Sequence, residues 1–339
     1  MTPLTCPRCG TTYGPPARFC IRDGFALTPA GGDAAAASRR SPGLHRTGEI
    51  RPPAPRRDPA SGMQGRVLDG RYAIERRVGE GGMAWVYQAK DQQTGRPVAI
   101  KVLMSRLVSD AESIARLRRE AGLALKLSHP NVCGLLGHGE MDGMPYLVMP
   151  FLEGETLSQR ANRVGPMPAA DALPILIEVA LGLQHAHDAG VLHRDLKPEN
   201  VMLVPDGQNE RAVVMDFGLA KERIVGPELN KLTATGIVLG TPEFMSPEQI
   251  RGKPLDPRSD VYGLGVLAFE LLTGELPFVG ETAQETMLNH LTGRPRRLRQ
   301  VDPAAPEWLE RVIDRALSLA PDARWGSMRD LAEALRAGR

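Results

Sequence analysis

The stretch HRDLKPEN at residues 193–200, followed by DFG at 216–218, places an acid, a cation and an amide close together in the sequence. The Asp195 carboxylate is suited to accept a proton, and the Lys197 ammonium is suited to stabilise negative charge. The Asn200 amide and the acid that opens the second motif supply the oxygen ligands that a hard cation such as Mg²⁺ prefers. The two motifs therefore indicate a site where a hydroxyl group and a phosphate meet beside a metal ion.

These motifs resemble the catalytic loop and the metal-binding segment of bacterial eukaryotic-type (Hanks-type) serine/threonine protein kinases. The resemblance covers residues 72 to 335. It implies an α+β fold of two lobes in a kinase domain at 66–338, with a β-rich N-lobe at 66–150 and a helical C-lobe at 153–338. It also implies transfer of the ATP γ-phosphate to serine or threonine hydroxyls of protein substrates in bacterial signalling.

The resemblance assigns a role to each residue of the two motifs. Asp195 would accept the proton of the substrate hydroxyl, and Lys197 would stabilise the transferring phosphoryl group. Asn200 and Asp216 would hold Mg²⁺ or Mn²⁺. Thr241 is similar to the threonine that contacts the catalytic acid and lysine in serine/threonine-specific members of the family.

A glycine-rich turn between two predicted strands is suited to phosphate binding. The alternating run at 72–78 predicts one strand, GEGGMA at 79–84 forms the turn, and a second strand is predicted from Trp85. Backbone N–H groups can approach phosphates closely where glycine lacks a Cβ atom. The turn resembles the kinase glycine-rich loop, with Ala84 in place of its third glycine. The ATP site that the resemblance implies comprises Val78, Gly79, Glu80, Gly81, Gly82, Met83, Ala84, Val86, Ala99, Lys101, Met149, Pro150 and Leu152.

Lys101 lies in the apolar run VAIKVL at 98–103, which predicts a buried strand. A partly desolvated ammonium on such a strand needs counter-charges. The phosphates of ATP and the carboxylate of Glu120 are expected to supply them, with Glu120 on a helix predicted to begin near Ser109. By resemblance, Lys101 and Glu120 therefore belong to the catalytic machinery.

The hinge that the resemblance places between the lobes departs from the family pattern at one position. Met149 would lie behind the adenine ring. Pro150 replaces the usual acidic residue and has no N–H, but the family uses the carbonyl group of that residue and the N–H two positions later, here that of Leu152. We expect little loss of ATP binding.

The polar segment at 219–242 resembles the activation segment of the family. Thr233 and Thr235 stand where bacterial members phosphorylate themselves, and either is a candidate phosphorylation site. Arg194 supplies the cation with which such a phosphate would pair, and this pairing would order the segment. A transient homodimer is the arrangement expected for such self-activation. The alternative is that both threonines are ordinary solvated loop residues.

Two helices and one ion pair are expected to hold the larger lobe together. A helix is predicted at 169–190, and a second, apolar on nearly all faces, at 259–272. A helix that is apolar all round is buried, and Asp260 at its start is expected to contact the catalytic loop. Glu248 is expected to pair with Arg324 by resemblance.

Composition places few constraints on the partners of this chain. It has 339 residues and a net charge of +2, so its bulk charge favours neither nucleic acid nor a membrane. We see no run of 18 apolar residues and no basic-then-apolar leader at the N-terminus. The sequence thus predicts a cytoplasmic protein without a membrane partner.

The first 27 residues resemble a short zinc ribbon. Cys6 and Cys9 form a C-x-x-C pair, and Cys20 with Asp23 forms a second pair in which the carboxylate replaces the usual thiolate. Four such ligands suit a tetrahedral Zn²⁺ site, and a segment this small would depend on the metal to fold. The alternative is a tail with incidental cysteines. A zinc ribbon here would serve as a contact for a protein partner.

Residues 28–65 are rich in Pro, Ala, Gly and Arg and contain almost no large apolar side chains. Such a composition buries too little surface to offset its ordering entropy, so a disordered linker is expected.

Two other classes of protein stand beside the kinase interpretation. A pseudokinase scaffold would bind nucleotide without transferring phosphate, but the chain retains the lysine, both acids and the asparagine that the chemistry needs. A nucleic-acid-binding protein would need aromatic side chains for base stacking, and Tyr13, Phe19 and Phe25 are the aromatic residues in the first 65. Nucleic acid is therefore an unlikely partner.

Overall fold

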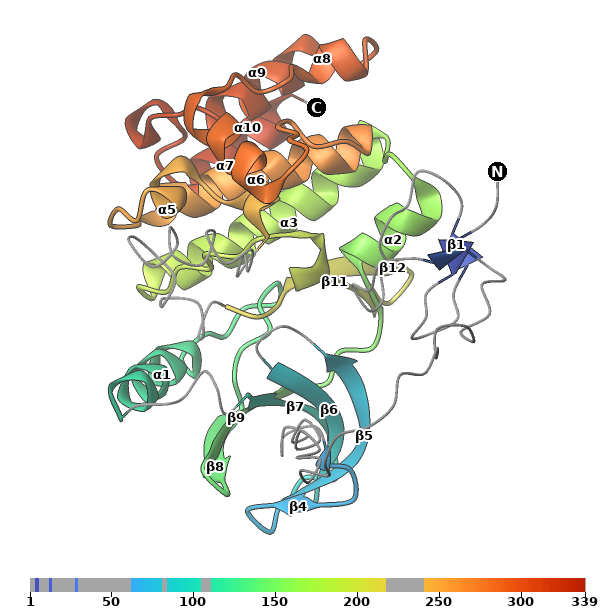
Figure 1. The fold of residues 1–339 in the computed structure, drawn as a ribbon, viewed down its shortest axis with the longest axis vertical. Coiled ribbons are helices and arrows are strands. Elements are labelled where there is room, and N and C mark those ends of the chain that lie inside the picture. The colour runs from blue at the N-terminus through green and yellow to red at the C-terminus, as the bar shows by residue number, and fades with distance from the viewer. Residues whose placement is uncertain are drawn as a thin grey trace, which may run out of the picture. The chain divides into compact units, whose positions relative to one another are not determined.

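The computed structural model describes residues 4–5, 12–13, 28–29, 62–80, 84–104, 111–217 and 241–338. The chain divides into two compact units, Met1–Arg56 and Arg57–Arg339 (Figure 1). The second unit contains the whole region that resembles a kinase.

The first unit contains a small antiparallel sheet in the order β2-β1-β3, formed by β1 (Leu4–Thr5), β2 (Thr12–Tyr13) and β3 (Thr28–Pro29). In this sheet Leu4 pairs with both Tyr13 and Pro29. The four predicted zinc ligands, Cys6, Cys9, Cys20 and Asp23, lie outside the described residues. The two residues of strand β3 fall in the stretch at 28–65 that composition predicts to be a disordered linker.

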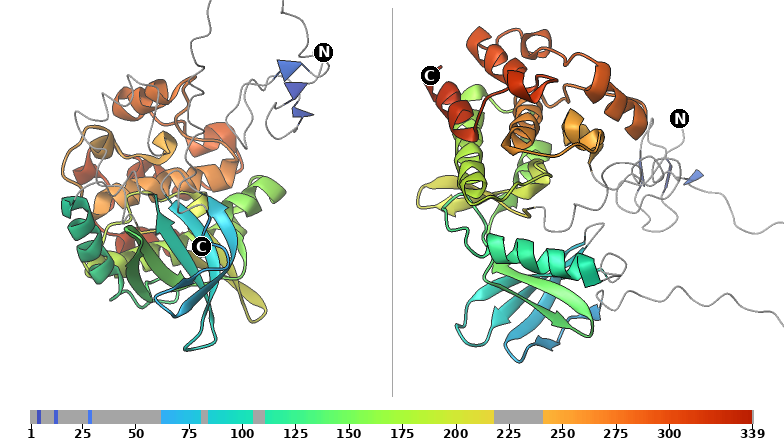
Figure 2. Two further views of the ribbon diagram at one scale, coloured as in Figure 1. Left: turned by 60° about the horizontal axis from the view of Figure 1, so that its bottom comes forward. Right: turned by 90° about the vertical axis from the view of Figure 1, so that its left-hand side faces the viewer.

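The N-lobe is built on a six-stranded antiparallel sheet in the order β4-β5-β6-β7-β9-β8. Its strands are β4 (Val67–Leu68), β5 (Tyr72–Glu80), β6 (Ala84–Asp91), β7 (Pro97–Leu103), β8 (Gly137–Met141) and β9 (Met144–Pro150). Helix α1 (Ala111–Ala124) lies beside β8 (Figure 2). Met63 is 1% exposed and packs into the core of this lobe, so the ordered domain begins before the predicted boundary at 66.

The C-lobe is mainly helical, with one small sheet in the order β10-β11-β12 beside the catalytic loop. Its elements are β10 (Glu155–Thr156), α2 (Leu157–Val164), α3 (Ala169–Asp188), η3 (Pro198–Asn200), β11 (Val201–Asp206), β12 (Asn209–Val214), η4 (Pro242–Phe244), α5 (Pro247–Ile250), α6 (Pro257–Thr273), α7 (Ala283–Thr292), α8 (Leu298–Val301), α9 (Glu307–Ala316), η5 (Pro321–Ala323) and α10 (Met328–Ala337). The predicted division into a β-rich and a helical lobe is therefore present in the structure.

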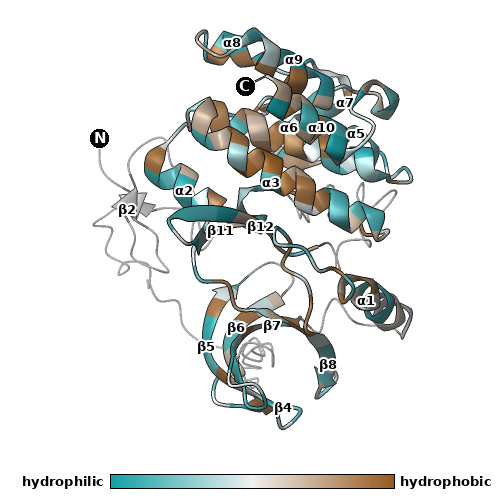
Figure 3. Cartoon of the chain, turned by 180° about the vertical axis from the view of Figure 1, so that it is seen from behind, coloured by the Kyte–Doolittle hydropathy of each residue, from teal (hydrophilic) through white to brown (hydrophobic). Residues whose placement is uncertain are grey.

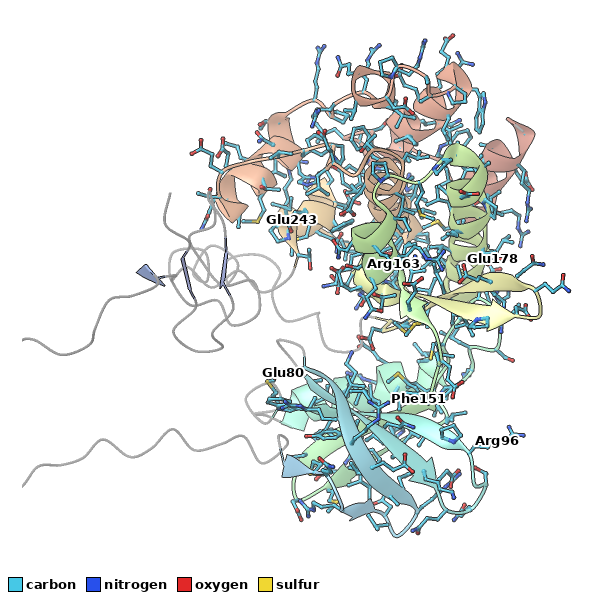
Figure 4. All side chains as sticks on the ribbon, turned by 90° about the vertical axis from the view of Figure 1, so that its right-hand side faces the viewer. Glu80, Arg96, Phe151, Arg163, Glu178 and Glu243 are labelled. Atoms are coloured by element: carbon cyan, nitrogen blue, oxygen red, sulfur yellow. The ribbon has the colours of Figure 1, made fainter. Side chains whose placement is uncertain are left out.

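Helices α3 and α6 form the core of the C-lobe. The apolar residues of α3 appear as brown bands in Figure 3, and this helix contacts α6, α10 and β12. By length and composition α3 is long and apolar enough to span a membrane, and half of its apolar window is buried inside the lobe. Glu178 of α3 lies beside the β11–β12 hairpin (Figure 4), where it accepts a hydrogen bond from the Ala212 N–H at 2.7 Å.

Candidate active site

The loop between α3 and η3 carries the first motif, and side chains from neighbouring elements form hydrogen bonds with its backbone groups. Asp260 of α6 is buried and accepts hydrogen bonds from the N–H groups of His193 and Arg194, each at 2.8 Å. It also contacts His187 Nε2 at 2.7 Å. Burial raises the pKa of Asp260, but these donors outweigh it and the pKa lies below its ordinary value. The predicted contact of Asp260 with the catalytic loop is confirmed.

His193 joins this loop to the segment that carries the second motif. Its Nδ1 lies 3.3 Å from the Asp195 N–H, and its Nε2 lies 2.8 Å from the Met215 carbonyl oxygen. Nδ1 must therefore accept and Nε2 must donate, which requires a neutral ring. Burial lowers the pKa of His193 and favours that form. The ring of Phe217 packs edge-on against it, with the centroids 5.0 Å apart.

The structure brings together four of the predicted catalytic residues. Lys197 Nζ donates a hydrogen bond to Thr241 Oγ1 at 2.8 Å and lies 3.7 Å from Asp195 Oδ2. Asn200 Nδ2 donates to the backbone oxygen of Asp195 at 2.7 Å and lies 3.2 Å from Asp195 Oδ2. A chain of contacts thus joins the Thr241 hydroxyl, the Lys197 ammonium, the Asp195 carboxylate and the Asn200 amide.

Asp216 follows β12 and forms an ion pair with Lys101 of β7. Lys101 Nζ lies 2.8 Å from Asp216 Oδ1, and the two side chains are 20% and 33% exposed. Burial raises the pKa of Asp216, but the charge and hydrogen bond of Lys101 outweigh it, so the pKa is lowered. The backbone of Asp216 has φ 55°, in the left-handed region that non-glycine residues seldom adopt. The carboxylate is therefore ionised and directed to the ammonium group.

The predicted pairing of Lys101 with Glu120 is wrong for this structure. Glu120 Oε1 of α1 instead lies 3.5 Å from an Nη of Arg194, and both side chains are 22% exposed. Lys101 already has a close counter-charge in Asp216, whereas Glu120 lies where α1 meets the catalytic loop. The position of α1 relative to this loop decides which cation the glutamate reaches.

Four predicted ATP residues share one face of the N-lobe sheet: Val86 of β6, Ala99 and Lys101 of β7, and Met149 of β9. Val86 is opposite Lys101 and Ala99 is opposite Met149, so these side chains point the same way. The alternate residues of β7, Val98, Ile100 and Val102, belong instead to the core on the other face. The predicted strand at 98–103 is confirmed as β7.

The rest of the predicted ATP site lies in the glycine-rich turn and the hinge. Gly79 and Glu80 end β5, and Ala84 begins β6. Pro150 ends β9 and is followed by Leu152 in a segment without regular structure. Gly81, Gly82 and Met83 lie outside the described residues, as do Gly218 and the candidate phosphorylation sites Thr233 and Thr235.

A magnesium ion fits the two oxygen-bearing residues predicted to hold it. Asp216 and Asn200 come from adjoining segments, joined by a 2.8 Å hydrogen bond from the Met215 N–H to the Asn200 carbonyl oxygen. Mg²⁺ in phosphate-binding sites takes one or two protein ligands and completes its shell with phosphate oxygens and water. Within the described ranges, no group of three or more His, Cys, Asp or Glu side chains could hold a metal ion. One carboxylate and one amide are a donor set that suits a metal shared with a phosphate substrate.

A buried ion pair anchors the segment that follows Thr241. Arg324 holds both carboxylate oxygens of Glu248, at 2.7 and 2.8 Å, and its side chain is 0% exposed. Ser259 Oγ donates a third hydrogen bond to Glu248 Oε1 at 2.7 Å. The predicted pairing of Glu248 with Arg324 is confirmed, and the arginine and serine fix α5 to the body of the C-lobe.

Comparisons with known proteins agree with this geometry. The protein kinase domain family matches residues 72–335. The chain is 41% identical over 274 residues to serine/threonine-protein kinase pkn2 of Myxococcus xanthus, covering 80% of this chain and 33% of pkn2. It is 38% identical over 267 residues to PrkC of Bacillus subtilis, covering 79% of this chain and 40% of PrkC. The chain thus spans well under half the length of these two relatives.

Among solved structures, the PknI kinase domain of Mycobacterium tuberculosis resembles this chain with a TM-score of 0.65 and 30% identity. The match covers 81% of this chain and 99% of that domain. The predicted kinase fold of the second unit is therefore confirmed.

Proposed function

This chain belongs to the protein kinase family, and from its similarity to bacterial serine/threonine-protein kinases we propose that it transfers the ATP γ-phosphate to protein hydroxyl groups. The observation that carries this proposal is that Lys197 and Asn200 both contact the Asp195 carboxylate, while the Thr241 hydroxyl holds the Lys197 ammonium. Bacterial signalling in the cytoplasm is the setting that the proposal implies.

Asp195 acts as the proton acceptor for the substrate serine or threonine. Its carboxylate is held by the Asn200 amide and faces the Lys197 ammonium, so its orientation is set before a substrate arrives. Lys197 stabilises the negative charge of the transferring phosphoryl group, and the Thr241 hydroxyl fixes the position of its ammonium. Catalysis of this kind consists of positioning and charge stabilisation.

Asp216 and Asn200 are the residues that would hold magnesium, or manganese in its place. When bound, the metal ion would neutralise charge on the phosphate oxygens of ATP. Lys101 lies on the same sheet face as Val86 and contacts Asp216, so its ammonium is close to both the metal ligand and the proposed nucleotide face.

We propose that phosphorylation of Thr233 or Thr235 activates the kinase by competing with Glu120 for Arg194. A phosphate carries more charge than a carboxylate and can accept two hydrogen bonds from one guanidinium group. Because Arg194 lies 3.5 Å from Glu120 in this structure, its transfer to a phosphate would release the glutamate to pair with Lys101. Phosphorylation between two copies of the chain would need only a transient homodimer.

A phosphotransfer assay with wild type and Asp195→Asn tests the proposed function. Loss of the general base should lower phosphate transfer from labelled ATP and Mg²⁺ by about 10²- to 10⁴-fold. ATP affinity should stay within about twofold, because Asp195 contacts the hydroxyl substrate and not the nucleotide. Mass spectrometry of residues 219–242 should find phosphate on Thr233 or Thr235 in the wild type and none in the variant.

Two outcomes would contradict the proposal. Unchanged transfer by Asp195→Asn would remove this residue from the role of base. A wild-type protein that binds ATP and transfers no phosphate, even with a range of protein substrates, would favour a nucleotide-binding scaffold instead.

A further inference from the structure

Arg194 directly precedes the proposed base. Its backbone conformation is unfavourable and must be stabilised by contacts with other elements. Its φ is 65°, in the left-handed region where a side chain crowds the following carbonyl group. Its N–H is held by Asp260 at 2.8 Å. Its carbonyl oxygen accepts a hydrogen bond from Gln249 Nε2 at 2.7 Å. The two ends of this residue are therefore fixed by side chains from two different helices.

The Gln249 side chain has a second contact that fixes which way its amide faces. The Ser246 N–H donates to Gln249 Oε1 at 2.9 Å, and the Gln249 N–H donates to Ser246 Oγ at 3.4 Å. These two bonds form the capping box at the start of α5. Because Oε1 faces an N–H and Nε2 faces a carbonyl oxygen, the hydrogen-bond pattern itself assigns the amide orientation.

Helix α5 is in turn fixed to the C-lobe by the residue before Gln249. Glu248 is buried and holds Arg324 and Ser259 through hydrogen bonds of 2.7 to 2.8 Å. The Gln249 backbone therefore cannot follow a movement of the catalytic loop. Its side chain therefore holds the Arg194 carbonyl group in a fixed position.

Resting on the proposed function, we propose that Gln249 is a positioning residue for the proton acceptor Asp195. The Gln249 amide holds the carbonyl group of the peptide that links Arg194 to Asp195, and so sets the direction in which the Asp195 side chain leaves the backbone. Gln249 does not touch the proposed reacting atoms. It joins the segment after Thr241 to the catalytic loop, so the loop depends on the correct folding of that segment.

Gln249→Glu separates positioning from capping. Glutamate is isosteric with glutamine and is itself a capping-box residue, so α5 and the melting temperature should be retained. Its ionised carboxylate offers no donor to the Arg194 carbonyl oxygen and repels it. We expect kcat to fall on the order of tenfold, with the KM for ATP within about twofold of wild type.

The pH profile of this variant gives a readout that a purely structural role would not produce. A protonated glutamic acid has a carbonyl oxygen for Ser246 and an O–H donor for Arg194, so it reproduces the amide pattern. The ratio of variant to wild-type kcat should therefore rise as the pH falls from about 8 towards 5. A ratio that is independent of pH would overturn the proposal.

Ser246→Ala is the matched control, because it removes the hydroxyl cap of α5 and leaves the Gln249 contact with Arg194 in place. It should lower the melting temperature and leave kcat near that of wild type. If Gln249→Glu retains wild-type kcat while the wild type is active, the positioning role is refuted and the proposed function stands. If the wild type transfers no phosphate, the proposed function itself fails.

Discussion

Glu270 of α6 is a carboxylic acid whose surroundings favour its neutral, protonated form. Burial raises the pKa of Glu270 to about 7, with further contributions from the negative charges of Glu199 and Glu243. Its Oε2 is buried and has no hydrogen-bond partner among the described residues. Glu199 lies in the catalytic loop, and Glu243 lies in the segment before α5 (Figure 4). Ionisation of Glu270 would therefore place a third negative charge close to the carboxylates of Glu199 and Glu243.

Replacement of Glu270 should make the protein more stable at high pH. An acid whose pKa is raised by folding binds extra protons in the folded state, so stability falls as the pH rises from about 4.5 to 7. Above pH 7 the whole cost is present. Glu270→Gln should therefore raise the free energy of unfolding on the order of 2 kcal/mol at pH 8 and change it little near pH 4.5. Urea denaturation at the two pH values measures the difference.

The exposed Glu333 of α10 provides the control for this prediction. Glu333→Gln should change the free energy of unfolding by no more than about 0.5 kcal/mol at either pH. An equal effect of Glu270→Gln at both pH values would show that the carboxyl group is not titrating as described.

Single-residue predictions from the sequence succeed where the partners lie close in the chain. Asp195, Lys197 and Asn200 meet because they share one short loop. The pairing of Lys101 with Glu120 fails because it depends on where α1 lies, which no local pattern determines. Gln249 had a sequence signal, the Ser-Pro-Glu-Gln capping box at 246–249, but nothing in that signal indicates a carbonyl group more than fifty residues earlier in the chain.

At the level of elements, Arg324 connects the segment before α10 to α5 and α6. Besides its two bonds to Glu248, it donates to the carbonyl oxygens of Ser318 and Arg258, each at 2.8 Å. Its guanidinium group also lies over the ring of Tyr262, 4.8 Å from the centroid. Because this cation is fully buried, these protein acceptors surround it in place of water. Loss of the side chain would leave the Glu248 carboxylate buried with its main counter-charge removed.

Arg324→Ala should lower the free energy of unfolding by about 3–5 kcal/mol, the usual result of removing one partner of a buried ion pair. The control is Arg311→Ala, since Arg311 pairs with Glu307 on α9 and both side chains are 65% exposed. That substitution should cost no more than about 0.5 kcal/mol. Urea denaturation of both variants tests the contrast, and equal losses would contradict the structural role of Arg324.

Sequence patterns predict the positions of the helices well and the residues at which they begin and end less well. The predicted helices at 169–190 and 259–272 correspond to α3 and α6, because both are long and continuously apolar. Helix α6 begins two residues earlier than predicted, since Asp256 caps it by accepting a hydrogen bond from the Arg258 N–H at 2.8 Å. Ser259, the cap that the sequence predicts for this helix, and Asp256 followed by proline are equally good start signals, so local sequence could not choose between them.

For the whole molecule, the sequence predicts two ordered parts, at 1–27 and 66–338, joined by a linker, and two local features lie within the predicted linker. Strand β3 has two residues, too few to show a period of two in its sequence. Met63 is one apolar residue in a polar stretch, yet it is 1% exposed in the N-lobe core. Composition averaged over many residues cannot detect either feature. The division of the chain into two compact units falls between Arg56 and Arg57.

The second unit should fold and act without the first, whereas the first should depend on zinc. The hydrophobic clusters of the described residues lie between Met63 and Leu335, so removal of residues 1–56 takes nothing from them. A fragment of residues 57–339 should melt within about 2 °C of the full chain and retain its phosphate transfer. We propose that Cys6, Cys9, Cys20 and Asp23 bind Zn²⁺ and present a surface to a protein partner.

The zinc content of purified protein tests whether the first unit, and not the second, binds the metal. The full chain should contain about one equivalent of zinc, and both the 57–339 fragment and a Cys6→Ser/Cys9→Ser variant should contain none. The melting transition of the kinase domain should be the same in all three proteins, because its core contains none of the four ligands. A full chain without zinc would leave the first unit as a tail with incidental cysteines. A fragment that does not fold would mean that the first unit contributes to the stability of the kinase domain.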